Sequence, residues 1–113
     1  MPRSAAATAL KTNASIFAAL GDETRLALLA ELTKGEPQSI TRLTSNTRLT
    51  RQAVTKHLRV LEEVGVVRSE RSGRESLFEL QPKPLVDART YLDHVSRQWD
   101  NALARLKALV ETS

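Results

Sequence analysis

The sequence predicts a mainly α-helical fold with one small β-hairpin, on three observations. Leucines recur throughout the 113 residues beside two phenylalanines, one tyrosine and one tryptophan, and leucine loses little side-chain entropy in a helix. Apolar residues repeat at helical spacings of three and four over most of the chain. Between residues 66 and 80 this period gives way to two short apolar runs around a Ser-Gly turn, which is typical of a hairpin.

Two helices are expected in the first third of the chain. A short apolar stripe over residues 16–20 ends at Gly21, and Asp22 is a typical N-cap because its carboxylate accepts a hydrogen bond from a free backbone amide. The second helix is therefore expected over residues 22–34, before Gly35 and Pro37. Its apolar positions lie three apart, at Leu26, Leu29 and Leu32.

A second pair of helices is expected in the middle of the chain. Ile40 and Leu43 are three apart and Thr41 is available as a cap, which predicts one or two helical turns over residues 40–47. After a turn, Thr50 begins a stronger helix that Gly65 ends. Its apolar stripe consists of Ala53, Val54, His57, Leu58, Leu61 and Val64. Two short helices joined by a tight turn and followed by a hairpin match the winged helix-turn-helix plan.

The last helix has the sharpest periodicity in the chain. Pro82 and Pro84 end the second strand of the hairpin and can begin this helix. Its apolar residues then alternate spacings of three and four, as in the a and d positions of a coiled coil: Leu85, Ala88, Leu92, Val95, Trp99, Ala102, Leu106 and Leu109. A helix of about 25 residues spans nearly 40 Å, more than a domain this small can cover, so we expect self-association. The alternative is packing on its own domain, with Trp99 near Phe17.

The charge pattern points to an anionic partner. The chain has 17 Lys and Arg against 13 Asp and Glu and a pI near 10, which favours nucleic acid. From Thr41 to Leu61 five residues are basic and none is acidic. On the helix from Thr50, the face away from the apolar stripe has side chains that can read base edges in a major groove: Arg51, Gln52, Thr55, Lys56 and Arg59. The alternative, a merely solvated face, usually mixes both signs of charge.

The hairpin is a candidate DNA-binding wing over residues 68–75. Arg71 and Arg74 flank its turn, where an arginine can enter a minor groove. Glu70 and Glu75 are interleaved with these arginines and Arg68, so a solvated hairpin with cross-strand charge pairs is the alternative.

Three segments together resemble the ArsR family of bacterial winged-helix repressors. They are the runs FAALGDETR from Phe17, TRQAVTKHL from Thr50 and LEEVGVV from Leu61, and the resemblance covers about residues 14–110. Glu23 departs from the family, which often has proline there, but glutamate is also favourable at a helix N-terminus. The resemblance implies a homodimer formed by the first and last helices, with two recognition helices on a pseudo-palindromic operator.

No metal site is expected, although the family includes metal sensors. Its arsenic and cadmium sensors use cysteines near the recognition helix, and this chain has no cysteine. Its zinc sensors use an Asp-x-His pair and two further ligands on the last helix, whereas this helix has Asp87, Asp93, His94 and Asp100 at other spacings. A metal-responsive repressor with a weak site of His94 and an aspartate across the dimer axis remains an alternative. The pattern indicates no particular inducer.

Catalysis, a cofactor and membrane attachment are not expected. His57, Ser69 and Ser72 have residue types used in nucleophilic catalysis but no recognisable spacing, and there is no Gly-rich phosphate loop. The apolar run over residues 5–10 is too short for a signal-peptide core or a membrane span, and the absence of cysteine suits a cytoplasmic protein. A winged-helix dimer acting mainly through protein contacts is the competing function.

The sequence thus predicts a cytoplasmic homodimeric repressor that binds double-stranded DNA, organised as a flexible tail (1–12), a winged helix-turn-helix domain (13–82) and a dimerisation helix (83–113). The expected DNA-binding residues are Arg42, Thr50, Arg51, Gln52, Thr55, Lys56, His57, Arg59, Arg71 and Arg74. The expected dimer interface consists of Ile16, Phe17, Leu85, Ala88, Leu92, Val95, Trp99, Ala102 and Leu106.

Overall fold

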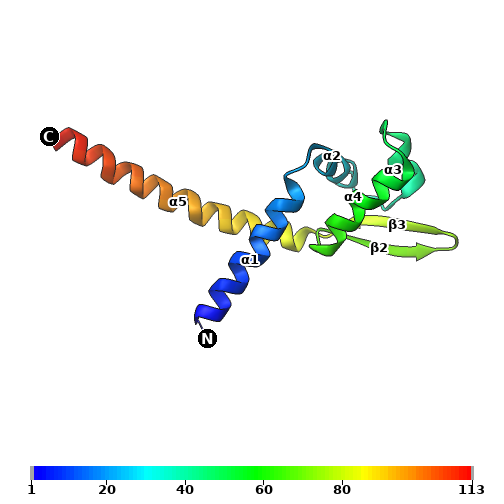
Figure 1. Cartoon of the computed structure of the whole chain (residues 1–113), viewed down its shortest axis with the longest axis horizontal. Coiled ribbons are helices and arrows are strands. Elements are labelled where there is room, and N and C mark those ends of the chain that lie inside the picture. Colours follow the sequence, from blue (N-terminus) through cyan, green and yellow to red (C-terminus); the bar gives the residue numbers. More distant parts are fainter. Residues whose placement is uncertain (1, 113) are drawn as a thin grey trace.

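The fold is a winged helix-turn-helix domain from which one long helix projects (Figure 1). The computed structural model describes residues 2–112, with side chains from residue 7 onward. Along the chain the elements are α1 (Pro2–Leu20), α2 (Glu23–Leu32), β1 (Gln38–Ser39), α3 (Ile40–Ser45), α4 (Arg51–Glu63), β2 (Val67–Ser72), β3 (Glu75–Leu80) and α5 (Pro82–Thr112). The predicted fold class, mainly α-helical with a small β-hairpin and a long C-terminal helix, is confirmed.

Side-chain caps set the starts of three helices. Asp22 accepts a hydrogen bond from the Arg25 amide at 3.0 Å, and Thr50 accepts one from the Ala53 amide at 3.1 Å, as the sequence predicted. The predicted cap at Thr41 is wrong. Ser39, with an extended backbone, caps α3 by accepting from the Arg42 amide at 3.1 Å. Helix α3 therefore begins two residues earlier than a cap at Thr41 would allow.

The first helix extends through the segment that was expected to be a tail. The structure places residues 2–12 in α1, so it has no element boundary at residue 12. Alanine has the highest intrinsic helix propensity, and this segment is rich in it. Thr12 and Ser15 also donate side-chain hydrogen bonds to carbonyls four residues earlier, at 2.9 and 3.0 Å. An Ala-rich segment can thus extend a helix without an apolar stripe.

The sheet has one strand more than the predicted hairpin. Strands β2 and β3 pair in register from Val67↔Leu80 to Ser72↔Glu75, and Gly73 takes a positive φ of 61° at the turn. Strand β1 pairs with β3 at Gln38↔Phe78 and Ser39↔Leu77, giving the order β1-β3-β2. Two residues are too few to show the alternation by which a strand is recognised in a sequence.

The core lies between α1, α2, α3, α4 and the sheet. Its most deeply buried side chains include Leu28, Leu43, Leu58 and Val66. The predicted apolar stripe of α2 is partly wrong, because Leu26 is 51% exposed whereas Leu28, Leu29 and Leu32 are buried. The adjacent pair Leu28-Leu29 lies on the core face, and a spacing of three alone did not identify it.

Helix α5 is packed against the domain only along its first part. Leu85 packs against the core and Ala88 is buried, but every residue from 96 to 112 is exposed. The Cα radius of gyration is 18.8 Å, against about 13 Å for a compact chain of this length. Figure 1 shows α5 extending well beyond the rest of the molecule. The C-terminal half of α5 thus buries none of its described side chains in the single chain.

Candidate nucleic-acid interface

Helix α4 has one buried face and one basic face. Val54, Leu58 and Leu61 are fully buried against the core. On the other side, the five predicted base-reading side chains line one open groove: Arg51, Gln52, Thr55, Lys56 and Arg59. The structure therefore brings together the central part of the predicted site. The dimensions of an exposed α-helix suit the major groove of B-DNA.

Local contacts distinguish the side chains in this groove. The Thr55 hydroxyl donates to the Arg51 carbonyl at 2.8 Å, and the Arg51 guanidinium donates to the Thr41 hydroxyl of α3 at 3.2 Å. The side chains of Gln52, Lys56 and Arg59 make no hydrogen bond or ion pair with the described residues. These three side chains are therefore free to bind an external partner.

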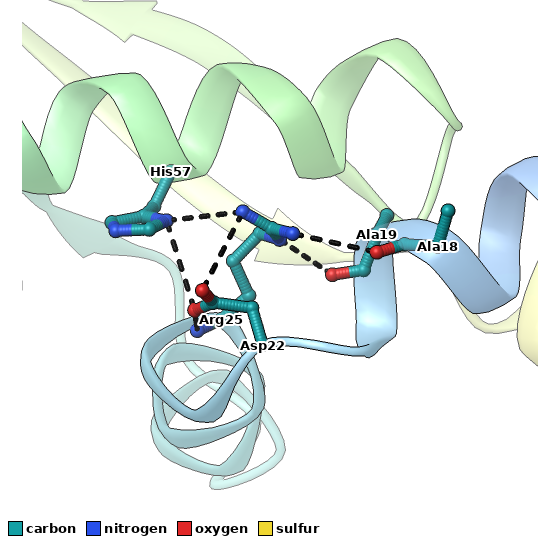
Figure 2. A network of polar contacts seen from close by, with 5 residues as sticks. All are labelled: Ala18, Ala19, Asp22, Arg25 and His57. Atoms are coloured by element: carbon teal, nitrogen blue, oxygen red, sulfur yellow. Dashed lines mark hydrogen bonds and ion pairs between the residues drawn. The ribbon is translucent and has the colours of Figure 1, made fainter.

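His57, which was predicted to contact DNA, lies on another side of α4. It is two residues after Thr55, which rotates it about 200° around the helix axis. Its Nδ1 lies 3.3 Å from Nη1 of Arg25 and 3.9 Å from Oδ1 of Asp22 (Figure 2). His57 thus contacts the start of α2 and does not line the groove formed by the other predicted side chains of α4.

Asp22 is held as a carboxylate in this polar cluster. The Arg25 amide donates a hydrogen bond to it, which lowers the pKa of the Asp22 carboxyl, and the nearby positive charge of Arg25 acts in the same direction. The sequence indicated Asp22 as a cap but gave no sign that Arg25 and His57 meet, since they are 32 positions apart.

The wing has both paired and unpaired arginines. Arg68 forms an ion pair across the two strands with Glu79, an acidic residue other than the Glu70 and Glu75 that the charge-pair interpretation named. Arg71 and Arg74 are exposed and make no ion pair with a described residue; the Arg71 Nε donates a long hydrogen bond of 3.5 Å to the Gly73 carbonyl. The wing tip therefore keeps two positive charges available.

Arg42 lies apart from the basic groove of α4. It lines a separate polar hollow at the end of α2 and along α3, together with Glu31, Lys34, Glu36, Gln38 and Asn46. Two acidic residues thus share its surroundings, whereas none lines the groove on α4.

The expected dimer residues fall into two groups. Ile16 and Ala88 are 2% and 3% exposed within the single chain, so they belong to its core and have little surface left for a partner. Leu92, Trp99 and Leu106 are exposed. The alternative of Trp99 packing near Phe17 is excluded, because Trp99 is 64% exposed and Phe17 instead contacts the ring of Tyr91, with centroids 6.1 Å apart.

Neither a metal cluster nor a spanning helix is found in the part of the chain that the structure describes. His94 is exposed, Asp87 forms an ion pair with Lys83 at 3.1 Å, and no three potential ligands gather among the described side chains. No helix within residues 2–112 has the length and apolar character needed to cross a membrane.

Comparison with known proteins agrees with this geometry. A family model described as a helix-turn-helix domain matches residues 11–70. The HTH-type transcriptional regulator YuzN of Bacillus subtilis (strain 168) is 39% identical over 77 residues, which are 63% of this chain and 84% of YuzN. The HTH-type transcriptional regulator Rv2034 of Mycobacterium tuberculosis is 33% identical over 94 residues, which are 83% of this chain and 84% of Rv2034.

A solved structure decides the family. An ArsR-like transcriptional regulator from Rhodococcus sp. RHA1 has 36% identity and a TM-score of 0.77, over 88% of this chain and 93% of that one. This chain belongs to the ArsR family. As an ArsR-family protein it is a DNA-binding transcriptional regulator, and α4 is the second helix of its helix-turn-helix. The relatives matched are likewise regulators of transcription.

Proposed function

We propose that this ArsR-family regulator is a homodimeric repressor that binds a pseudo-palindromic operator, with α4 in the major groove and the wing tip at the adjacent minor groove. The observation that supports this most directly is the basic groove on α4. It has no acidic side chain, and Gln52, Lys56 and Arg59 have no partner within the described chain. A repressor of this kind acts by occupying its operator and excluding the transcription machinery.

The position of each side chain along α4 determines whether we assign it a contact with a base or with the phosphate backbone. Arg51 and Gln52 lie in the first turn, which enters the groove most deeply, so we assign base contacts to them. Lys56 and Arg59 lie one and two turns later and contact the phosphate backbone. At the wing, Arg71 and Arg74 supply the charge that a narrow minor groove attracts.

A second copy of the chain is the proposed partner of α5. The part of this helix that leaves the domain presents Trp99, Leu103, Leu106, Leu109 and Val110 to solvent, each more than half exposed. An apolar surface of this extent is unusual on a soluble monomer. The alternating spacings of three and four suit pairing with an identical helix. Such a pair places two α4 helices on one operator.

Selection of bound sequences from random double-stranded DNA tests this function. We expect the selected sites to have two inverted half-sites about one helical turn apart. Affinity for them should fall by about 10³ to 10⁵ between 50 and 200 mM salt if roughly 6 to 10 phosphates are neutralised. With a selected site placed over a promoter, the protein should reduce transcription in vitro. A pool with no enriched sequence, or binding insensitive to salt, would instead favour a dimer that acts through protein contacts.

A further inference from the structure

We propose that Arg25 and His57 are positioning residues that hold the recognition helix α4 at a fixed angle to α1. This inference rests on the proposed function. It explains how the two recognition helices of a dimer keep the separation that an operator requires. Neither side chain lies in the basic groove, so neither is assigned a contact with DNA.

Arg25 is the centre of the arrangement (Figure 2). From α2 its Nε donates to the Ala19 carbonyl at 2.5 Å, and its Nη2 donates to the Ala18 carbonyl at 3.4 Å. Its Nη1 lies 3.3 Å from Nδ1 of His57 on α4. One guanidinium thus joins the last turn of α1 to the middle of α4, which its planar set of five donors makes possible.

The contact with His57 involves one ring nitrogen, Nδ1. A guanidinium only donates hydrogen bonds, so Nδ1 of His57 is the acceptor in this contact. The Asp22 carboxylate lies 4.0 Å from Nη1 of Arg25 and 3.9 Å from Nδ1 of His57, on the other side of this contact. The Asp22 side chain also accepts a hydrogen bond from the Arg25 amide. Asp22 therefore fixes the start of α2, the helix that carries Arg25.

The position of His57 on α4 explains why it can act on the DNA-binding face without touching DNA. It lies roughly opposite Thr55, so the His57–Arg25 contact fixes the rotation of α4 about its own axis. The buried leucines on the same helix tolerate small rolls, because apolar contacts are not directional. A hydrogen bond to a charged group is directional and therefore restricts the roll.

The other end of the arrangement leads to the dimerisation helix. The α1 turn that accepts from Arg25 also carries Phe17, whose ring contacts Tyr91 of α5 with centroids 6.1 Å apart. The Phe17 carbonyl accepts a hydrogen bond from the Gly21 amide at 2.9 Å. The next two carbonyls of α1, those of Ala18 and Ala19, accept from Arg25. The orientation of α5 is thus linked through α1 to α4, and the spacing between the two operator-binding helices depends on Arg25.

Three variants separate positioning from contact with DNA. His57→Leu removes the acceptor, whereas His57→Asn retains an acceptor near the position of Nδ1 and is the matched control. Arg25→Lys keeps the charge but loses the planar set of donors. Each variant is measured on the selected operator and on the same operator with one base pair inserted at its centre. The affinity for the selected operator divided by the affinity for the lengthened operator is the spacing ratio. It reports how strictly the distance between the two recognition helices is maintained.

We expect His57→Leu and Arg25→Lys to lower this spacing ratio by about tenfold, the order expected for loss of a hydrogen bond to a charged group that orders an element. The preference for the base read by Gln52 and the sedimentation of the dimer should not change, and His57→Asn should behave like the wild type. An unchanged spacing ratio in both disrupting variants would overturn the proposal. A fourth variant, Arg25→Ala, removes the charge; a salt slope reduced by about one in it would also overturn the proposal, since that loss indicates a phosphate contact.

A second measurement needs no DNA and therefore remains decisive if no operator is found. The chain has no cysteine, so Lys11→Cys on α1 and Gln52→Cys on α4 provide two clean sites for nitroxide labels. With labelled chains diluted into excess unlabelled protein, the distance distribution between the labels should be narrow in the wild type and His57→Asn. It should broaden in His57→Leu and Arg25→Lys. Equal widths in all four proteins would overturn the positioning role, whatever the outcome for DNA binding.

Discussion

Gln52 is the side chain in the basic groove with the clearest chemical assignment. It is exposed in the first turn of α4, has no partner within the described chain, and its amide can pair with N6 and N7 of adenine.

Replacing Gln52 by alanine should cost about 1 to 3 kcal/mol on the preferred operator and relax selectivity at one base position. Binding measurements on operators that vary at each position check this. Lys56→Ala is the matched control, and it should weaken binding to all sequences alike. A uniform loss for Gln52→Ala as well would place Gln52 on the backbone instead.

Asp22 makes stability depend on pH at the acidic end. Its folded-state pKa is lowered, chiefly by the hydrogen bond from the Arg25 amide, so the ionised carboxylate favours the folded state. This contribution is present above the unfolded pKa of an aspartate, about 4, and is lost as the pH falls through the lowered folded value.

Asp22→Asn tests the charge separately from the cap, because asparagine caps a helix about as well as aspartate. Urea unfolding between pH 2 and 5 should show a constant difference in the free energy of unfolding at the upper end. The difference should shrink below about pH 4. A difference that is the same at pH 2 and pH 5 would contradict the assignment.

At the scale of elements, α4 and the wing present two kinds of positive charge. The groove on α4 contains unpaired cations, whereas the hairpin has one arginine neutralised by Glu79 and two free at its tip. A paired arginine must break its ion pair before it can contact a phosphate.

Arg71→Ala and Arg74→Ala should each weaken DNA binding and lower the slope of log affinity against log salt by about one. Arg68→Ala is the matched control on the same hairpin, and its effect on the slope should be smaller because Arg68 is paired with Glu79. Titrations at four salt concentrations make the comparison. Equal slopes for all four proteins would show that the wing tip does not contact DNA.

For the whole molecule, the length of α5 is the dominant feature. Its 31 residues extend about 46 Å, and the part beyond Val95 makes no buried contact within the described chain. Trp99 is 64% exposed there, so its apolar surface becomes buried only in an assembly.

Trp99→Ala should dissociate the proposed dimer, with a cost of about 3 to 5 kcal/mol if the ring is fully buried at the interface. Sedimentation at micromolar concentration should show a monomer, and the melting temperature should lose the dependence on protein concentration that a dimer has. Asn101→Ala, on the same exposed part of α5 but off the apolar repeat, should leave the dimer intact. A dimeric Trp99→Ala protein would move the interface elsewhere.

Local features of the sequence determined much of the fold and the recognition helix. The caps at Asp22 and Thr50, the hairpin around Gly73 and the boundaries of α4 depend on interactions within a few residues, which a sequence displays directly. The basic face of α4 was equally visible, because a helix of known period places Arg51, Gln52 and Thr55 on one side.

Contacts between distant segments were decided only by the tertiary structure. The apolar repeat of α5 predicts which face of the helix is apolar, but not what packs against that face. Only the tertiary structure shows that Ala88 is buried in the chain's own core and that Trp99 is not. Likewise, His57 fitted the apolar stripe of α4, and its partner Arg25 is 32 positions away. Periodicity specifies the direction in which a side chain points, whereas its partner depends on how helices pack, and that is a property of the whole chain.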